Sequence, residues 1–304
     1  MERIRSMAPI LNYIALLLAA SIVLPIEQGS AAPRERPEAI ATINIIADLV
    51  SQVAGDRIEV HSLLPLGGDP HTYEPVPGDL KKIAHSDIVF YNGLGLEKWL
   101  EKLLRNAGGV RKEIEVTQGL KAKIDARGHT DPHLWMNPEF VRTAYIPNIV
   151  RALINFDPGG EEQYKRNAER YIKELEELDA WARNVVSQIP PENRKLVTTH
   201  DAFAYFGEHY GFKIIGSIWG VSTEDEPSPR DISRLIDMIK REKVKAVFVE
   251  TTINPKLMES IAHEAKVKIG RPLYGDSLGP EGSGAETYIG MIKRNLEAIA
   301  EALR

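Results

Sequence analysis

The chain contains no cysteine among its 304 residues. Without thiols it forms no disulfide bond and offers no thiolate to a metal ion, so any metal site must use histidine, aspartate or glutamate. The attachment point for an N-terminal lipid is missing for the same reason. We therefore expect a protein that is not anchored to a membrane.

Positively charged residues are fewer than negatively charged ones. Lysine and arginine total 38 against 43 aspartates and glutamates, which gives a formal net charge of −5, and no long basic run occurs. This balance argues against a nucleic-acid partner and against binding to an anionic membrane surface. The hydrophobic content of 43% and the charged content of 27% are ordinary for a globular protein, which excludes disordered and fibrous chains.

The N-terminus has the three regions of a secretory signal peptide. Arg3 and Arg5 precede an apolar stretch at 10–24, and small residues follow at 29–32. This order predicts a cleaved signal peptide at 1–31. The apolar stretch is shorter than the roughly 20 residues that a membrane-spanning helix needs. We expect a soluble protein of a bacterial periplasm.

Strand-like and helix-like segments alternate after the leader, which predicts an α/β fold with parallel sheets flanked by helices. The predicted boundaries are an N-terminal lobe at 32–159, a linking helix at 160–189 and a C-terminal lobe at 190–304. Predicted strands are 39–45, 58–64, 87–91, 113–116, 196–199, 213–217, 246–250 and 267–274, and predicted helices include 80–84, 232–241, 255–266 and one from about 286.

The predicted linking helix has apolar residues that step by four and three from Tyr164 to Ile189. At 1.5 Å per residue it would be roughly 40 Å long, about the length of a domain. A coiled-coil dimerisation seam is one interpretation. Because the stripe is narrow and uses tyrosine and alanine, packing along both domains as a stiff spine fits better.

Four potential metal ligands each follow a segment that reads as a buried strand: His71, His133, His200 and Asp276. In open α/β folds, ligands collect in the crevice beyond the carboxyl ends of the strands. Three imidazoles and one carboxylate meeting there would complete the coordination of a divalent transition metal. Nearby glycines would let the chain turn sharply after the strand, and prolines would stiffen the loops so that the ligands are placed before the ion arrives.

The remaining histidines are interpreted as ordinary surface or core residues: His61, His85, His129, His209 and His263. Of these, His129 lies four residues before His133 and could also be an accessory ligand. Ligating imidazoles usually donate their second N–H to a carboxylate or carbonyl group. The candidates near the predicted ligands for such supporting roles are Asp69, Asp201, Glu250 and Ser277.

Several separated motifs together resemble the zinc and manganese group of metal-specific substrate-binding proteins of ABC importers, the periplasmic solute-binding protein family 9. The motifs occur in the same order over essentially the whole mature chain: Asp-Pro-His-Thr-Tyr-Glu-Pro, Asp-Pro-His-Leu-Trp-Met-Asn-Pro, Thr-His-Asp-Ala-Phe, Gly-Val-Ser-Thr-Glu-Asp-Glu-Pro and Gly-Asp-Ser-Leu-Gly. The resemblance implies two lobes joined by one long helix, with the ion buried between them. It also implies His71, His133, His200 and Asp276 as ligands, no catalysis, and a membrane permease with a cytoplasmic ATPase as partner of a monomer.

The identity of the metal stays open between Zn2+ and Mn2+, with Fe2+ behind them. Three histidines and one aspartate in a tetrahedron suit Zn2+, whereas an Asp276 that binds through both oxygens would suit Mn2+. Within the family, glutamate at the third position accompanies manganese or iron, so His200 favours zinc. Dedicated zinc members often carry a long histidine-rich loop, whereas the stretch at 121–130 here is short and holds one histidine.

Two further functions stay open: an exported metallohydrolase, and a periplasmic metal buffer or adhesin without a transporter. A hydrolase needs an open coordination position for water and a nearby base, and the sequence has no His-Glu-x-x-His motif. We also expect no Ser-His-Asp hydrolase. The acidic loop at 222–226 either contacts the transporter or caps the helix that follows it.

Overall fold

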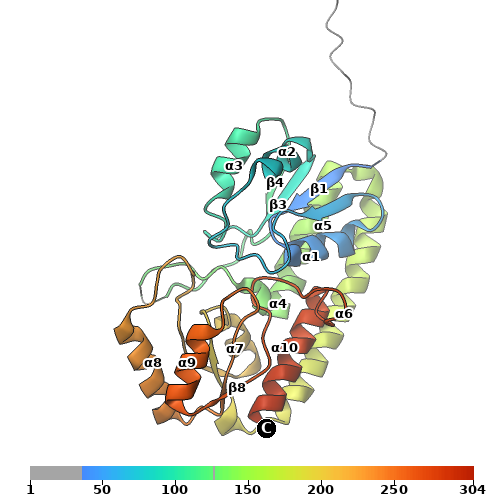
Figure 1. Ribbon diagram of the computed structural model, residues 1–304. Coiled ribbons are helices and arrows are strands. Elements are labelled where there is room, and N and C mark those ends of the chain that lie inside the picture. Colours follow the sequence, from blue (N-terminus) through green and yellow to red (C-terminus); the bar gives the residue numbers. More distant parts are fainter. Residues whose placement is uncertain (1–35, 126) are drawn as a thin grey trace, which may run out of the picture. The chain divides into compact units, whose positions relative to one another are not determined.

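Strands and helices alternate throughout the computed structural model, which describes residues 36–125 and 127–304 (Figure 1). The predicted signal peptide at 1–31 lies outside the described residues. Residues 36–304 form one compact unit. Within the described part, no helix combines the length and the apolar composition needed to cross a bilayer.

Before the long helix, four parallel strands form a sheet in the order β2-β1-β3-β4. The central strands β1 and β3 are buried, whereas β2 and β4 are partly exposed edge strands. The expectation of a buried strand before each candidate ligand is therefore wrong for the first two. The elements are β1 (Glu38–Ala41), α1 (Asn44–Ala54), β2 (Glu59–Ser62), α2 (Pro77–His85), β3 (Ile88–Tyr91), α3 (Leu100–Ala107) and β4 (Lys112–Glu115).

A run of short helical turns leads from this sheet to the long helix α6 (Glu161–Ser187), which confirms the long helix predicted at 160–189. Its N-terminal half contacts α1, because Asn167 and Arg170 donate to backbone carbonyls near the end of α1. Its C-terminal half contacts the second part of the chain through Asp179 and His209. The connecting elements are η1 (Leu134–Met136), α4 (Pro138–Phe140), the π-helical η2 (Val141–Tyr145), α5 (Ile146–Phe156) and η3 (Pro158–Gly160).

After α6, two parallel strand pairs, β5-β6 and β7-β8, continue the α/β pattern. The Phe248 N–H donates to the Val197 carbonyl at 2.9 Å and links the pairs, so their order β6-β5-β7-β8 repeats that of the first sheet. The strands predicted at 246–250 and 267–274 are shorter, although Glu250 and Leu273 still form a parallel bridge. The elements are η4 (Pro191–Asn193), β5 (Lys195–Thr198), α7 (Ala204–Tyr210), β6 (Lys213–Ser217), α8 (Pro229–Glu242), β7 (Ala246–Val247), α9 (Lys256–Ala265), β8 (Lys268–Ile269) and α10 (Tyr288–Leu303).

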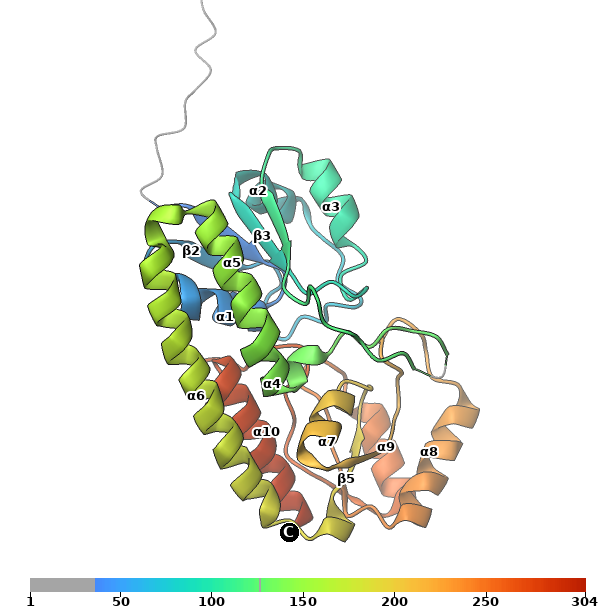
Figure 2. The same ribbon diagram turned by 180° about the vertical axis from the view of Figure 1, so that it is seen from behind.

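One hydrophobic core runs through both parts of the chain. It includes Leu49 of α1, Ile149 of α5, Leu175 of α6 and Leu296 of α10. Figures 1 and 2 show α6 running beside α1 and α5 and then beside α10. The apolar stripe of α6 is thus covered by this same chain, which rules out the interpretation of the stripe as a dimerisation seam.

Candidate metal centre

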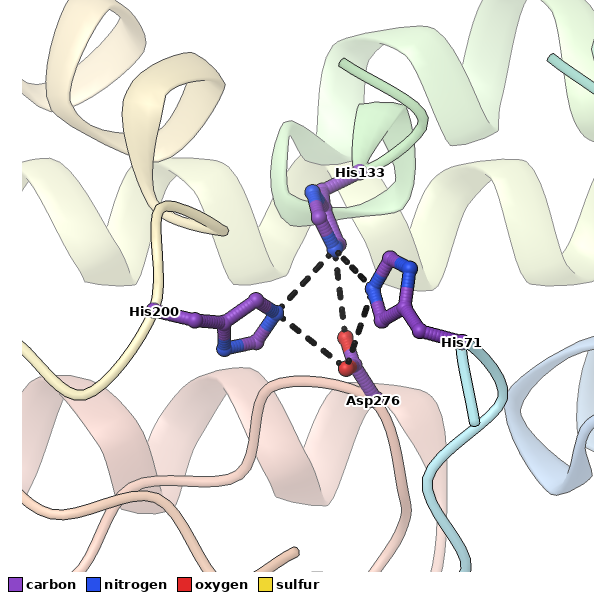
Figure 3. A group of neighbouring side chains, drawn as sticks. All are labelled: His71, His133, His200 and Asp276. Carbon is purple, nitrogen blue, oxygen red and sulfur yellow. Dashed lines mark hydrogen bonds and ion pairs between the residues drawn. The ribbon is translucent and has the colours of Figure 1, made fainter. Parts of the chain in front are cut away.

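The four predicted ligands meet at one point. His71, His133, His200 and Asp276 each offer a ligand atom, and these atoms all lie within 4.8 Å of one another (Figure 3). All four residues are buried. The Nε2 atoms of His71 and His200 are each 3.2 Å from Nε2 of His133; Asp276 Oδ2 is 3.2 Å from His200 Nε2 and 3.7 Å from His71 Nε2, and Asp276 Oδ1 is 3.5 Å from His133 Nε2.

Each predicted ligand comes from a different loop at the carboxyl side of the strands. His71 follows β2, and His133 immediately precedes η1 after β4. His200 lies two residues beyond β5, and Asp276 follows Leu273, which bridges to Glu250. The two parts of the chain therefore contribute two ligands each. Because both sheets have the same strand order, their ligand loops can meet at one place.

Two buried carboxylates orient the imidazoles of His133 and His200. Asp131 Oδ1 accepts a hydrogen bond from the His133 backbone N–H and lies 2.8 Å from its Nδ1. Glu250 Oε1 accepts from the His200 backbone N–H, and Oε2 lies 2.8 Å from Nδ1 as an ion pair that is not aligned as a hydrogen bond. With a proton on each Nδ1, a neutral ring turns the lone pair of Nε2 toward the cluster.

The centre of the cluster consists of acceptors. Both oxygens of Asp276 are buried and have no hydrogen-bond partner within the described residues. In the protonation state that binds a metal, all three imidazoles are neutral, and their lone pairs at 3.2 Å repel one another and the carboxylate beside them. A buried polar group without a partner is costly. A cation among these atoms removes the repulsion and gives the carboxylate a partner.

The spacing fits a tetrahedral ion. Bonds of 2.0–2.1 Å to nitrogen and 2.0–2.2 Å to oxygen imply ligand–ligand distances of about 3.3–3.4 Å in a tetrahedron. The shortest distances for five of the six residue pairs run from 3.2 to 3.7 Å, and one ligand atom from each residue lies within 4.8 Å of the others. A Cβ on Gly275 would press against the carboxylate of Glu250, so glycine beside Asp276 allows this close packing.

Burial and neighbouring charges shift the pKa values of His71 and His200 in opposite directions. Burial lowers the pKa of His71 to about 3, and the neighbouring imidazoles add to this effect. Burial alone would lower the pKa of His200 as well, but Glu250 and Asp276 outweigh it and raise that pKa well above its ordinary value. Burial favours a raised pKa for Asp276, but the imidazoles, His200 first, outweigh it and lower that pKa. In the metal-free protein, His71 is thus neutral, whereas His200 carries a second proton beside ionised Asp276 and must lose it before Nε2 can bind a metal.

Buried hydrogen bonds tie the ligand loops of the two parts together. Trp135, next to the His133 loop, donates its indole N–H to the Gly275 carbonyl at 3.0 Å. Ser277 Oγ accepts from the Asn44 side chain at 3.0 Å and from the Gly67 backbone N–H at 2.9 Å. These contacts hold the loops in register before any ion arrives.

Of the supporting residues predicted from the sequence, Glu250 contacts a ligand side chain directly. Asp69 accepts from the His71 backbone N–H at 2.9 Å, and Ser277 connects loops. Asp201 is mostly buried, but one of its oxygens has no hydrogen-bond partner in the described part of the chain. The sequence analysis missed Asp131. Its place two residues before His133, in the Asp-Pro-His motif, was the available signal.

The other histidines lie outside the cluster. His61 is on β2 and pairs with Glu59, His129 pairs with Asp125 in its exposed loop, and His209 pairs with Asp179. His85 ends α2, and His263 is on α9. The cluster thus uses three of the eight histidines in the sequence.

The segment from Gly275 to Gly279 also spells Gly-x-Ser-x-Gly, a pattern found around hydrolase nucleophiles, which we did not expect. Its serine, Ser277, is buried and donates its hydroxyl proton to the Leu278 carbonyl. The hydroxyl therefore serves as a structural bridge, and no histidine base lies on it within the described residues.

Comparison with known proteins identifies the family. A family model described as the periplasmic component A of the zinc-uptake complex matches residues 40–302. The manganese-binding lipoprotein MntA of Halalkalibacterium halodurans is 38% identical over 278 residues, which cover 91% of this chain and 92% of the relative. The manganese ABC transporter substrate-binding lipoprotein PsaA of Streptococcus anginosus is 35% identical over 303 residues, covering 96% of each chain.

Solved structures show the same fold. The periplasmic zinc-binding protein TroA from Treponema pallidum superimposes with a TM-score of 0.83 at 31% identity, covering 88% of this chain and 99% of that one. The manganese-bound periplasmic metal-binding protein from Candidatus Liberibacter asiaticus gives a TM-score of 0.79 at 28% identity, covering 88% and 100%. The predicted α/β class is confirmed.

The expectation of a soluble periplasmic protein without a membrane anchor is wrong. The curated relatives that match nearly the full length are named lipoproteins, which are held at a membrane by a lipid. The expectation depended on the missing thiol and on the short apolar stretch at 10–24. The fold and the ligand cluster lie within residues 36–304 and form in the same way in a free or a tethered molecule, so they carry no information on location.

The match over residues 40–302 and the identities above 30% across nine-tenths of the sequence agree with the resemblance seen in the motifs. This chain belongs to the family of the periplasmic component A of zinc-uptake complexes.

Proposed function

We propose that this protein is the substrate-binding component of an ABC importer and that its cargo is a divalent transition metal, Zn2+ or Mn2+. His71, His133, His200 and Asp276 bind the ion. One observation carries the proposal: four buried ligand atoms from four loops meet at coordination distance, and the carboxylate among them has no partner within the described residues. Family membership supplies the transport context.

The ion lies, in this proposal, between an N-terminal lobe at 32–159 and a C-terminal lobe at 190–304, with residues 160–189 as the linking helix. The two-plus-two origin of the ligands supports this division. A membrane permease with its ATPase receives the cargo from a monomer. The names of the relatives, which include ABC transporter substrate-binding proteins, support this partner.

Both metals fit the donor set. The three imidazoles and one Asp276 oxygen match the tetrahedron that Zn2+ prefers. The two oxygens of Asp276 both face the cluster, one toward His133 and the other toward His71 and His200, which permits the higher coordination number that suits Mn2+. Among the relatives and solved structures, one is named a zinc-binding protein and others are named for manganese.

We propose binding without catalysis. A catalytic zinc keeps a position open for water, whereas four protein ligands fill the coordination of a tetrahedral ion. The relatives are named as transport components. Steady hydrolytic turnover by the zinc-loaded protein, absent when His200 is replaced, would favour the metallohydrolase instead.

The decisive variant is His200→Ala. It removes one donor from a four-donor site and leaves Glu250 Oε2 without the imidazole that it faces, so we expect affinity for Zn2+ and Mn2+ to fall at least about 100-fold. Calorimetric titration of both metals, with elemental analysis of protein purified without added metal, measures the change. Circular dichroism checks that the variant is folded.

His129→Ala is the matched control. This histidine is also close to His133 in sequence, but its side chain is 55% exposed and pairs with Asp125. Its removal should leave both affinities unchanged. Wild-type affinity in the His200 variant, or a loss in the His129 variant of similar size, would remove these four side chains as the binding site.

A further inference from the structure

A cavity of about 240 Å3 lies beside the ligand cluster, between His71 and the loops that surround it. His71 is the member of the cluster that lines this cavity, and it is also the most exposed of the four ligands, at 6% against 0–1% for the others. Its lining includes Leu94, Lys98 and Pro132 from before α6, and residues 218–222 and 224–227 with Asp231 from after it. An ion that reaches the cluster through this cavity meets His71 first.

The segment at 219–227 crosses this cavity between β6 and α8, and we name it the strap. Its first end is fixed because the Trp219 N–H donates to the Thr199 carbonyl and the Gly220 carbonyl accepts from the Asp201 N–H. Its other end leads into Ser228, which caps α8 by accepting from the Asp231 N–H. Between these fixed ends the strap has no helix or strand.

Two side-chain contacts join the middle of the strap to the part of the chain before α6. Thr223 donates its hydroxyl proton to Asp69 Oδ2 at 2.6 Å, and Glu224 forms an ion pair with Lys98. The other oxygen of Asp69 accepts from the His71 backbone N–H at 2.9 Å. Asp69 thus connects the strap with the loop of the most accessible ligand.

The contacts on the far side of the cluster are of a different kind. The Trp135 indole bonds to Gly275, and the Tyr288 hydroxyl donates to the Trp135 carbonyl at 2.7 Å. Trp135 and Tyr288 are fully buried in the shared core. Opening the molecule there breaks core packing. Lifting residues 222–226 of the strap, which follow the buried Val221, breaks one hydrogen bond to the rest of the chain and an ion pair whose lysine side chain is 61% exposed.

We propose that the strap is the gate through which the metal enters and leaves, and that the Thr223–Asp69 hydrogen bond is its latch. This inference depends on the proposed metal-binding function. The latch does not touch the ion. It raises the barrier that the ion must cross in both directions, so it sets the rates of exchange more than the affinity.

The test is Thr223→Val, which keeps the shape of the side chain and removes the hydroxyl donor. Stopped-flow exchange of Zn2+ and Mn2+ with a chromophoric chelator measures kon and koff. Hydrogen bonds to charged groups contribute enough that we expect both rates to rise about tenfold, with Kd changed less than about twofold. Ser222→Ala is the control, because this neighbouring strap hydroxyl contacts only Glu224 within the strap.

Lys98→Met removes the second contact without touching Asp69 and should raise both rates by a smaller factor. Wild-type rates in both variants would overturn the gate. A higher Kd with unchanged kon in Thr223→Val would also overturn it, since Thr223 would then act on the placement of His71. Failure of the wild-type protein to bind either metal would refute the proposed function itself, a result distinct from these.

Discussion

At the scale of single residues, the most informative feature is the pairing of His133 with Asp131 and of His200 with Glu250. Each pair fixes a ring so that one nitrogen faces the cluster. The two carboxylates come from different parts of the chain, one before and one after α6. The cluster is therefore prepared by groups that do not bind the ion themselves.

The protonation of His200 predicts how metal affinity depends on pH. Its pKa is raised in the metal-free protein, so the proton stays on at neutral pH and must leave when a metal binds. Affinity should therefore fall as pH falls, by up to about tenfold per unit for one released proton. Calorimetry at pH 7 in buffers of different ionisation enthalpy should count about one proton per ion.

In the metal-free protein, His200 and Asp276 make the stability of the fold depend on pH in opposite directions. A raised pKa means that His200 stabilises the fold at low pH and loses this contribution as pH rises through the folded-state pKa. A lowered pKa means that ionised Asp276 stabilises the fold at pH values above the ordinary pKa of a carboxyl group. This contribution is lost as pH falls through the lowered pKa. Metal affinity that stayed constant from about pH 6 to 8 would contradict the assignment of the proton to His200.

The sequence predicted the four clustered residues because each stands in a loop that follows a strand and within a motif of the family. It did not predict Asp131, because several acidic residues stand near the ligands and only the folded loops decide which of them reaches an imidazole. Asp201 shows the same limit. It follows His200 directly, yet its side chain does not contact that ring through a hydrogen bond.

At the scale of elements, α6 is the helix on which both sheets depend. Leu178→Ala removes a side chain that is 1% exposed in the shared core, so we expect the free energy of unfolding to fall by about 2–5 kcal/mol. Urea unfolding with a chelator present measures the loss. The neighbouring exposed Glu177→Ala should change stability by no more than about 0.5 kcal/mol. Equal effects would show that the stripe does not hold the core.

The long helix was predictable because its apolar periodicity persists and prolines follow it. The helices α3 and α5 were missed, although α5 has a clear apolar face. The strands after residue 245 were predicted longer than they are, because apolar residues there continue beyond the regular ladder. Phe248 and Val249 are buried, and their backbone groups still bond to Val197 and Leu273, but outside the two short strands.

At the scale of the whole molecule, one core spans the residues on both sides of α6, so a large rotation of the two parts on metal release would have to break it. We predict that the parts stay fixed. Cysteines at the exposed Lys102 of α3 and Asp237 of α8 carry spin labels without background, because the chain has no other cysteine. Their mean distance should change by less than about 2 Å between the metal-free and metal-loaded protein. A change of several ångströms would indicate hinge closure instead.

The even division of the four proposed ligands has a consequence for synthesis. A fragment that ends before α6 carries two of the donors, the number expected of a weak, incidental surface site, and so does a fragment that begins after it. Tight loading requires that both halves have been made, have folded and have met. In this proposal, only a complete and folded chain binds the metal tightly, and a truncated chain does not.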